Sequence, residues 1–408
     1  MNRSAIIFTS ALISVSTGTF AIDKVNIAGW GGNDIVVMNK LINEVLVDDF
    51  EEAGLNVNYL PVEGDFSQFI VNALSANTAP DAFYIDVSMA YALVQSGKVA
   101  ENNNLLKAIS YELVPSLNEA FTFSGRQFGL AKDFNTLALQ YNKDIFDDAS
   151  VAYPSDSDNW YDTLDKLKAI KKSLGNEVHG ICLMPDYARF APFALGAGWS
   201  PFNEQGKTVL DENFRRAFEF YTSLKSEGVG ILASDIGQEW GGGCFGTEKT
   251  AITIEGNWIS GYLRDKAPNL QYGSTMIPKA PSTGERGNLL FTVAWGINAQ
   301  GKNVAAAQKA VQILTSEKAQ SWVLISGLAL PSRLSLTDSS YFYNEDPESE
   351  LAKKVFFGAS EGHVVPFSFG KFGSKWMQPI NDALSSVLLD QENVTEALSK
   401  AQDKYNKM

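Results

Sequence analysis

The sequence has very few histidines and cysteines, with 2 of each among 408 residues. His179 and His363 stand apart without the spacing of metal ligands, which leaves little for histidine-based catalysis or a histidine metal site. The sequence also lacks a nucleophile elbow and an HExxH motif, and no Lys-Ser/Thr follows Gly241-Gly242-Gly243 to make a phosphate-binding loop. These absences argue against an enzyme, and we expect no metal and no cofactor.

Positive charge is also scarce, since 33 Lys and Arg face 47 Asp and Glu and give a formal net charge of −14. Such a field repels phosphate backbones and anionic membranes, so we expect no nucleic acid partner. With 45% hydrophobic residues the chain can build a large core, and its length suggests two domains or one large one. The partner is expected to be small, neutral or both.

Long hydrophobic runs are missing, and the apolar stretch from Ala5 to Val15 is shorter than the roughly 20 residues that cross a bilayer. Together with Arg3 before it and small residues up to Ala21 after it, this stretch predicts a signal peptide over residues 1–21, cleaved after Ala21. We therefore expect export to the periplasm. Cys182 and Cys244 would be exported as one disulfide or as two buried thiols, and the sequence leaves both alternatives open.

Hydrophobic periodicity predicts an alternation of strands and helices in the first part of the chain. Strands are expected at 25–28, 55–59 and 82–85, with helices from Asn33 or Asp34 as a cap to about Phe50 and over 66–74. This order is typical of a parallel α/β sheet. Since ligands collect at the carboxyl ends of such strands, Trp30, Asp86 and Ser88 are placed beside a potential site.

A second α/β series begins after an antiparallel-looking strand over 137–141. It comprises expected helices at 160–174 and 214–224 and expected strands at 180–184 and 251–254. A long apolar strand over 289–299 follows, and the remaining helices are expected at 305–314, 319–325, 380–388 and 394–401. No flexible linker separates the two series, so ordinary strands should join two lobes.

Aromatic residues are abundant, and five of the eight tryptophans lie within two residues of a glycine at an expected strand end or loop. These five are Trp30, Trp199, Trp240, Trp258 and Trp295. An indole there offers a flat apolar face and one N–H donor, which matches the ring of a sugar. The alternative for each is core packing, which we expect for the helical Trp160 and Trp322.

Polar residues accompany these aromatics at the expected strand ends, namely Asp86, Ser88, Lys132, Asp133, Asn135, Asp186, Arg189 and Glu255. Carboxylates and amides form paired hydrogen bonds to vicinal hydroxyls, so the set suits a neutral polyol. A surface charge or helix cap is the alternative for each. Paired carboxylates could also serve a secreted glycoside hydrolase, although so acidic a chain contains carboxylate pairs by chance.

Several segments in this order resemble the periplasmic oligosaccharide-binding proteins of ABC importers, the maltose-binding-protein-like solute-binding family. The resemblance covers nearly the whole chain after residue 21 and rests on Ala79–Asp86, Tyr91–Gly97, Gly129–Asn142, Phe245–Trp258 (FGTEKTAITIEGNW), Trp295–Ala299, Leu314–Gln320 and the final helical region.

The resemblance implies an α/β, two-lobed periplasmic binding protein fold with an interdomain ligand cleft and a multi-segment hinge. The N-terminal lobe would comprise 22–133 with 290–335, and the C-terminal lobe 136–287 with 338–408. The hinge segments would lie near Phe134, Asn288 and Thr337. A monomer that delivers its sugar to membrane permease subunits is also implied.

By position, the resemblance assigns Trp258 as the sugar-stacking aromatic, Asn135 to a cleft carboxylate position, and Tyr187 to a cleft tyrosine. Asp86 or Ser88 matches a cleft aspartate, and Trp376 is selected as a cleft aromatic from the segment after Phe367. Asn135 in place of a carboxylate and Ile85 in place of a Trp depart from the maltose binder and argue against its specificity.

The resulting prediction is a non-enzymatic periplasmic receptor that binds a mono- or oligosaccharide. Stacking would come from Trp30, Trp240, Trp258, Trp295 and Trp376, and hydrogen bonding from Asp86, Asp133, Asn135 and Asp186. A secreted hydrolase is the alternative from another class. A third interpretation keeps the receptor and replaces the sugar with a small charged ligand, for which the acidic residues favour a cation.

Overall fold

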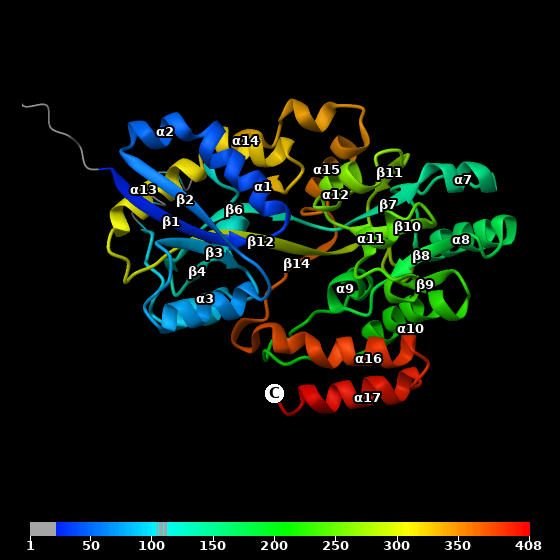
Figure 1. Ribbon diagram of the computed structural model, residues 1–408. Coiled ribbons are helices and arrows are strands. Elements are labelled where there is room, and N and C mark those ends of the chain that lie inside the picture. The colour runs from blue at the N-terminus through cyan, green and yellow to red at the C-terminus, as the bar shows by residue number, and fades with distance from the viewer. Residues whose placement is uncertain (1–21, 104, 106–108, 110–111) are drawn as a thin grey trace, which may run out of the picture.

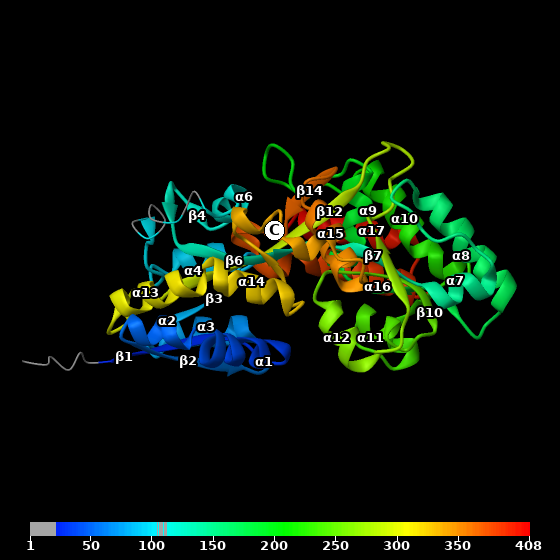
Figure 2. The ribbon, with the colours of Figure 1, turned by 90° about the horizontal axis from the view of Figure 1, so that it is seen from above.

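The computed structural model describes residues 22–408 except 104, 106–108 and 110–111, so the expected signal peptide lies outside the described residues. The chain forms two α/β lobes, each built around its own sheet (Figure 1). Seen from above, the lobes lie side by side and β12 runs between them (Figure 2). Within the described part, none of the helices is both long and apolar enough to cross a membrane.

The first lobe contains a seven-stranded sheet of order β13-β6-β12-β3-β1-β2, with β14 paired to β12. Its strands are β1 (Asp23–Trp30), β2 (Leu55–Val62), β3 (Ala82–Asp86), β6 (Gly129–Asn135), β12 (Gly287–Ile297), β13 (Leu330–Pro331) and β14 (His363–Pro366). The first three pair in parallel, as their periodicity predicts, whereas β12 runs antiparallel between β3 and β6. The sheet thus gathers strands from distant parts of the chain.

Helices pack around this sheet because their apolar positions recur at helical spacing. They are α1 (Asn33–Lys40), α2 (Val47–Glu52), α3 (Phe66–Ser75), α4 (Ala90–Gln95), α6 (Pro115–Glu119), α13 (Val304–Leu314) and α14 (Glu317–Ile325), with a small hairpin of β4 (Thr122–Phe123) and β5 (Arg126–Gln127). The helix expected to run on to Phe50 is interrupted by a π-helical turn over Leu41–Val45. This turn inserts an extra residue and still keeps Leu41 and Ile42 in the core.

The second lobe contains a five-stranded sheet of order β11-β7-β10-β8-β9. Its strands are β7 (Ala138–Asn142), β8 (His179–Leu183), β9 (Gly230–Leu232), β10 (Thr250–Glu255) and β11 (Tyr272–Thr275). Strand β7 is antiparallel to β10 and β11, as predicted. Every residue of β10 is buried, so the side chains at its end are held by a rigid element.

Helices cover this second sheet on both sides. They are α7 (Lys143–Ala149), α8 (Trp160–Leu174), α9 (Tyr187–Gly196), α10 (Glu212–Ser226), α11 (Gly241–Phe245), α12 (Ile259–Lys266), α15 (Pro347–Phe357), α16 (Gln378–Leu388) and α17 (Val394–Tyr405), with short 3₁₀ turns at Ala233–Ile236, Ser340–Tyr343 and Gly370–Met377. A further 3₁₀ turn at Leu334–Leu336 packs on α14 of the first lobe. A capping box at Asn159 fixes the start of α8 where the sequence predicts it.

The lobes are joined by crossing segments rather than by a tether. One passes from β6 to β7 and another enters β12, and Asn288 connects them. The Asn288 side chain accepts a hydrogen bond from the Leu137 amide at 3.0 Å and donates one to the Leu137 carbonyl at 2.8 Å. The third segment follows β13. The lobe boundaries given above stay a prediction.

The two cysteines form a disulfide within the second lobe, which resolves the open alternative. Cys182 in β8 and Cys244 in α11 are 62 residues apart in sequence and 6.3 Å apart between Cα atoms. The bond lies in a small buried cluster with Ala233. It therefore ties α11 to strand β8 of the second sheet.

Candidate functional site

A cavity of about 340 Å³ opens between the two lobes, at the carboxyl ends of β1, β3 and β10. Its lining comes from both lobes and consists of Trp30, Asp34, Asp86, Lys132, Asp133, Asn135, Trp258, Phe291, Thr292, Val293, Leu328 and Ala329. The volume lies within the range of small-molecule sites. Six residues selected from the sequence meet here, namely Trp30, Asp86, Lys132, Asp133, Asn135 and Trp258.

A network of buried charges forms the first-lobe wall of the cavity. Lys132 and Asp133 form an ion pair in which both side chains are more than nine-tenths buried. The Lys132 ammonium also lies 4.8 Å from the centre of the Tyr84 ring. The Tyr84 hydroxyl donates a hydrogen bond of 2.9 Å to Asp34. Burial raises the pKa of Asp34, although the Lys132 charge opposes that shift.

Asp86 projects from the end of β3 beside this network. Its carboxylate accepts a 2.8 Å hydrogen bond from the Ser88 amide and a second one from the Ser88 hydroxyl. Burial raises the pKa of Asp86, while these two bonds oppose the shift and nearby Asp133 adds to it. Ser88 therefore contacts Asp86 and is absent from the cavity lining.

The second-lobe wall is centred on Trp258, which directly follows the buried strand β10. Its indole N–H donates a 2.8 Å hydrogen bond to Glu255, and the same carboxylate oxygen accepts a 2.7 Å bond from Arg189. Glu255 has no exposed surface, and Arg189 also lies 3.8 Å from Asp186. Glu255, Asp186 and Arg189 thus hold the indole in place from behind and do not line the cavity.

A close backbone approach supports this arrangement. A Cβ on Gly241 would lie 2.6 Å from a carboxylate oxygen of Glu255 and 2.8 Å from the Thr253 hydroxyl. Only glycine leaves room for α11 to pack this closely on β10. The glycine run near Trp240 therefore serves packing rather than phosphate binding.

Contacts between the lobes complete the cavity. The side-chain Oδ1 of Asn135 accepts a 3.1 Å hydrogen bond from the backbone amide of Asn257, which joins β6 to the loop after β10. The Phe291 ring lies 5.5 Å from Trp258 in an edge-to-face arrangement and 4.8 Å from Phe367. Phe367 is thus the aromatic of this segment that lies next to the site. The resemblance instead selects Trp376 from the same segment as the cleft aromatic.

Several residues expected at the site lie elsewhere. Trp295 is 1% exposed in the first-lobe core, with its ring 5.0 Å from Tyr84. Trp376 is also 1% exposed, and its N–H donates a 2.7 Å hydrogen bond to Thr208 beside a different cavity of about 380 Å³. Both tryptophans fill cores because large apolar rings gain most from full burial.

Three further aromatic residues, Trp199, Tyr187 and Trp240, do not line the cavity either. Trp199 is buried and its N–H donates to the Val209 carbonyl. Tyr187 is fully buried, and burial raises its pKa. Trp240 is half-buried and packs edge-to-face on Tyr262 with ring centres 5.0 Å apart. We correct the expectation of direct ligand contact for Tyr187 and Trp240, as for Trp295 and Trp376.

The sequence reasoning missed part of the lining, namely Asp34, Phe291, Thr292, Val293, Leu328 and Ala329. Asp34 was considered as a helix cap, but no side-chain cap bond is present and its carboxylate lies in the cavity wall. Phe291 lies within a long apolar strand whose sequence contains no sign that one face borders a cleft.

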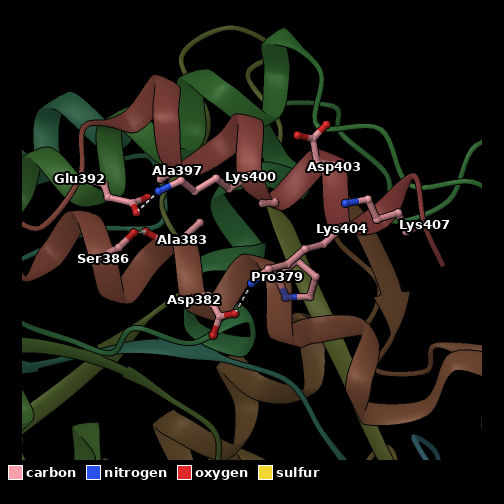
Figure 3. Close-up of a pocket in the computed structure, with 11 residues that line it drawn as sticks. Pro379, Asp382, Ala383, Ser386, Glu392, Ala397, Lys400, Asp403, Lys404 and Lys407 are labelled. Atoms are coloured by element: carbon pink, nitrogen blue, oxygen red, sulfur yellow. Dashed lines mark hydrogen bonds and ion pairs between the residues drawn. The ribbon is translucent and has the colours of Figure 1, made fainter.

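Another cavity, of about 390 Å³, lies between α16 and α17 on the outside of the second lobe (Figure 3). Four of its charged side chains form ion pairs, Lys404 with Asp382 at 2.6 Å and Lys400 with Glu392. No residue of the inter-lobe cavity contributes to it. It therefore has no link to the site between the lobes.

The sequence model of the bacterial extracellular solute-binding protein family matches residues 46–351, well over half of the chain. The chain belongs to this family. A putative binding protein of Brucella abortus is 27% identical over 278 residues, which are 65% of this chain and 65% of that protein. A maltooligosaccharide ABC transporter solute-binding lipoprotein of Streptococcus pneumoniae is 23% identical over 98% of this chain and 96% of that protein.

Solved structures of family-like receptors share the fold. An ABC substrate-binding protein from Listeria monocytogenes in complex with cycloalternan has a TM-score of 0.84 at 19% identity, covering 94% of this chain and 98% of that one. The GacH receptor of Streptomyces glaucescens has a TM-score of 0.81 at 22% identity, covering 94% and 98%. The two-lobed binding-protein fold is thereby confirmed. The family and these neighbours are binding proteins and not enzymes.

Proposed function

We propose that this protein is the receptor subunit of an ABC importer, which captures a mono- or oligosaccharide between its lobes and delivers it to membrane permease subunits. It acts as a monomer, and it is exported to the periplasm after cleavage behind Ala21. N-terminal sequencing of the exported chain checks the cleavage site. Closure around the ligand would create the form that the permease recognises.

The inter-lobe cavity is the observation that carries this proposal. Trp30 from the first lobe and Trp258 from the second both line it, and they are accompanied by the carboxylates of Asp86 and Asp133 and the amide of Asn135. Indole faces stack on the apolar face of a sugar ring, while carboxylates and amides bind its hydroxyls. A ligand held by both walls favours closure, because only the closed form allows both sets of contacts.

The relatives support the same class of ligand. Proteins named for maltooligosaccharide and diacetylchitobiose binding align with this chain at 23% and 22% identity. Solved neighbours of the same fold carry cycloalternan and maltotetraose, and one carries glycerophosphocholine. These ligands are mostly saccharides, so a saccharide is the favoured class. The hydrolase alternative receives no support, because the family and its neighbours are binding proteins.

The stacking role of Trp258 gives the direct test. In a screen of mono- and oligosaccharides by isothermal titration calorimetry, the ligand of the wild-type protein should bind Trp258→Ala about 10- to 100-fold more weakly, since a buried aromatic contact is lost. The half-buried Trp240 packs on Tyr262 outside the cavity. Trp240→Phe is therefore the matched control and should keep wild-type affinity.

Two results would contradict the proposal. Unchanged affinity in Trp258→Ala would show that Trp258 does not stack on the ligand. The absence of binding to every saccharide in the screen would show that the ligand is not a saccharide. Cleavage of an oligosaccharide during the incubation would show that the protein is a hydrolase and not a binding-only receptor.

A further inference from the structure

The inter-lobe cavity contains more negative charge than its own residues neutralise. Three carboxylates, those of Asp34, Asp86 and Asp133, line it together with a single ammonium group, that of Lys132. The Lys132 ammonium is in contact with Asp133. This leaves Asp34 and Asp86 without a direct cationic partner among the residues that the structure describes.

The partners of these two carboxylates are uncharged donors. Asp34 accepts from the Tyr84 hydroxyl through one oxygen, and Asp86 accepts from Ser88 through one oxygen. Among the described residues, no hydrogen bond reaches the second oxygen of either side chain. Asp34 is only 7% exposed, yet it lines the cavity. This second oxygen, which has no donor in the described part of the protein, is accessible rather than buried in each carboxylate, so a ligand donor in the cavity can bind it.

The second lobe does not supply the missing positive charge. The Arg189 guanidinium lies 6.0 Å from the centre of the Trp258 ring. It is held by Glu255 at 2.7 Å and lies 3.8 Å from Asp186. That cluster therefore has two carboxylates for one cation. Closure of the lobes would bring a second excess of negative charge toward the first.

The aromatic walls of the cavity suit a cation as well as a sugar ring. Trp30, Trp258 and Phe291 line it from both sides, and Trp258 and Phe291 lie edge-to-face at 5.5 Å. The faces of aromatic rings attract ammonium groups, and indole does so most strongly. Among the described residues, no group of three or more His, Cys, Asp or Glu converges as metal ligands do. An organic cation fits this chemistry better than a metal ion.

Closure of the lobes increases the energetic cost of the uncompensated negative charge in the cavity. When the lobes exclude water, an uncompensated carboxylate loses its hydration, and hydroxyl groups restore only part of the loss. An ammonium group restores both the hydrogen bonds and the charge. A neutral sugar would stack its ring on the aromatic side chains and donate hydrogen bonds from its hydroxyls, but it would leave the charge unbalanced.

We propose that the ligand is an amino sugar with a free, protonated amine, whose ammonium group lies between Asp34 and Asp86 while its ring stacks on Trp30 or Trp258. This proposal rests on the proposed function, because it names the class of saccharide that the same cavity binds. It assigns Asp34 and Asp86 as the residues that select a charged sugar over a neutral one.

Matched ligands test the charge. Cellobiose, diacetylchitobiose and chitobiose differ at one position of each ring, which carries a hydroxyl, an acetamide or an ammonium group, and glucose, N-acetylglucosamine and glucosamine form the monosaccharide series. In calorimetric titrations at neutral pH, where the carboxylates are more fully ionised than in acid, the ammonium member of at least one series should bind at least about tenfold more tightly than both neutral members. Maltose and putrescine complete the panel.

Isosteric variants test the two carboxylates. Asp86→Asn and Asp34→Asn keep the acceptor oxygen and remove the charge, so each should weaken the ammonium ligand about 10- to 100-fold and change a neutral analogue by less than about threefold. Asp403 is exposed on α17 beside the outer cavity of Figure 3 and does not line the inter-lobe cavity, so Asp403→Asn makes the same change in net charge outside the site. It should leave every affinity unchanged.

The outcomes separate this inference from the proposed function. If neutral sugars bind as tightly as ammonium sugars, or if Asp86→Asn weakens both equally, the amino-sugar proposal is wrong and the sugar receptor remains. If putrescine binds and no saccharide does, both proposals are wrong. If Asp403→Asn reproduces the loss, the net charge of the molecule causes the preference and the assignment of Asp34 and Asp86 is wrong.

Discussion

Glu255 is a buried carboxylate with two partners and a structural position behind the site. It accepts from Arg189 at 2.7 Å and from the Trp258 indole at 2.8 Å, and it is 0% exposed. Removing one member of such a cluster leaves the others buried without a partner. Glu255 thus couples the orientation of a ligand-facing ring to the packing of the second lobe.

The raised pKa values of Asp34 and Asp86 predict how stability changes with pH. The charged and titratable groups acting on them are Lys132, Asp133 and Tyr84, and burial is the largest cause of both shifts. A carboxyl with a raised pKa binds more protons in the folded state, so its contribution to stability is present near its ordinary pKa and lost as pH rises through the raised one.

We therefore expect the unliganded wild-type protein to lose stability relative to the Asp34→Asn, Asp86→Asn double variant as the pH increases from about 4 to about 8. Urea unfolding midpoints across this range measure the difference. A difference that is constant with pH would show that neither carboxyl has a raised pKa. The Asp403→Asn variant, altered at an exposed position, should follow the wild type.

At the residue scale, sequence reasoning found the side chains that follow strands. Trp30, Asp86 and Trp258 line the cavity because strand ends of parallel sheets meet at one edge. Burial explains why other tryptophans that we expected at the site do not line the cavity. Trp295 carries the same local signature as Trp258, and Trp376 was selected through the resemblance. Both lie in the cores, and only the packing around each ring distinguishes them from Trp258.

At the element scale, the helices and strands with regular apolar spacing were predicted closely. Helix α8 spans Trp160–Leu174 as its periodicity and its capping residue indicate, and β2 alternates buried and exposed residues as expected. The short elements β13 and β14 were not predicted. Each is held by its pairing with a longer strand, and neither contains a pattern of its own.

The disulfide between β8 and α11 gives a prediction at this scale. It closes a 62-residue separation, so replacing both partners in Cys182→Ser, Cys244→Ser should lower the free energy of unfolding by about 2–4 kcal/mol, because the unfolded chain regains its freedom. Chemical denaturation of both proteins without reductant measures this loss.

Reduction of the wild-type protein provides the control. It should bring the wild-type unfolding midpoint down to that of the double variant, whose own midpoint should not respond to reductant. Equal stability of the oxidised wild type and the variant would contradict a stabilising role for the bond.

At the scale of the whole molecule, the two lobes are connected where Asn288 joins β12 to the segment between β6 and β7. Its side chain makes hydrogen bonds of 3.0 and 2.8 Å to Leu137. The Asn135 to Asn257 hydrogen bond is a further link between the lobes at the cavity. Such few connections permit relative motion of the lobes, as in hinge-bending receptors.

Ligand binding should therefore make the protein more compact and more stable. A saccharide at a hundredfold excess over its dissociation constant should stabilise the folded state by about 2.7 kcal/mol, and small-angle X-ray scattering should show a smaller radius of gyration. Trp258→Ala at the same ligand concentration is the control, with a smaller response in both measurements. Stabilisation without compaction would exclude lobe closure.

The sequence by itself determined the α/β alternation, the strand-end residues and the resemblance that implied two lobes, because periodicity and short motifs are local properties of the chain. Tertiary structure alone decided that Cys182 and Cys244 are bonded, that Asp34 lines the cavity, and that Phe291 meets Trp258 across the lobes. These pairings join residues far apart in sequence. Their contacts depend on the packing of whole elements, which no local pattern encodes.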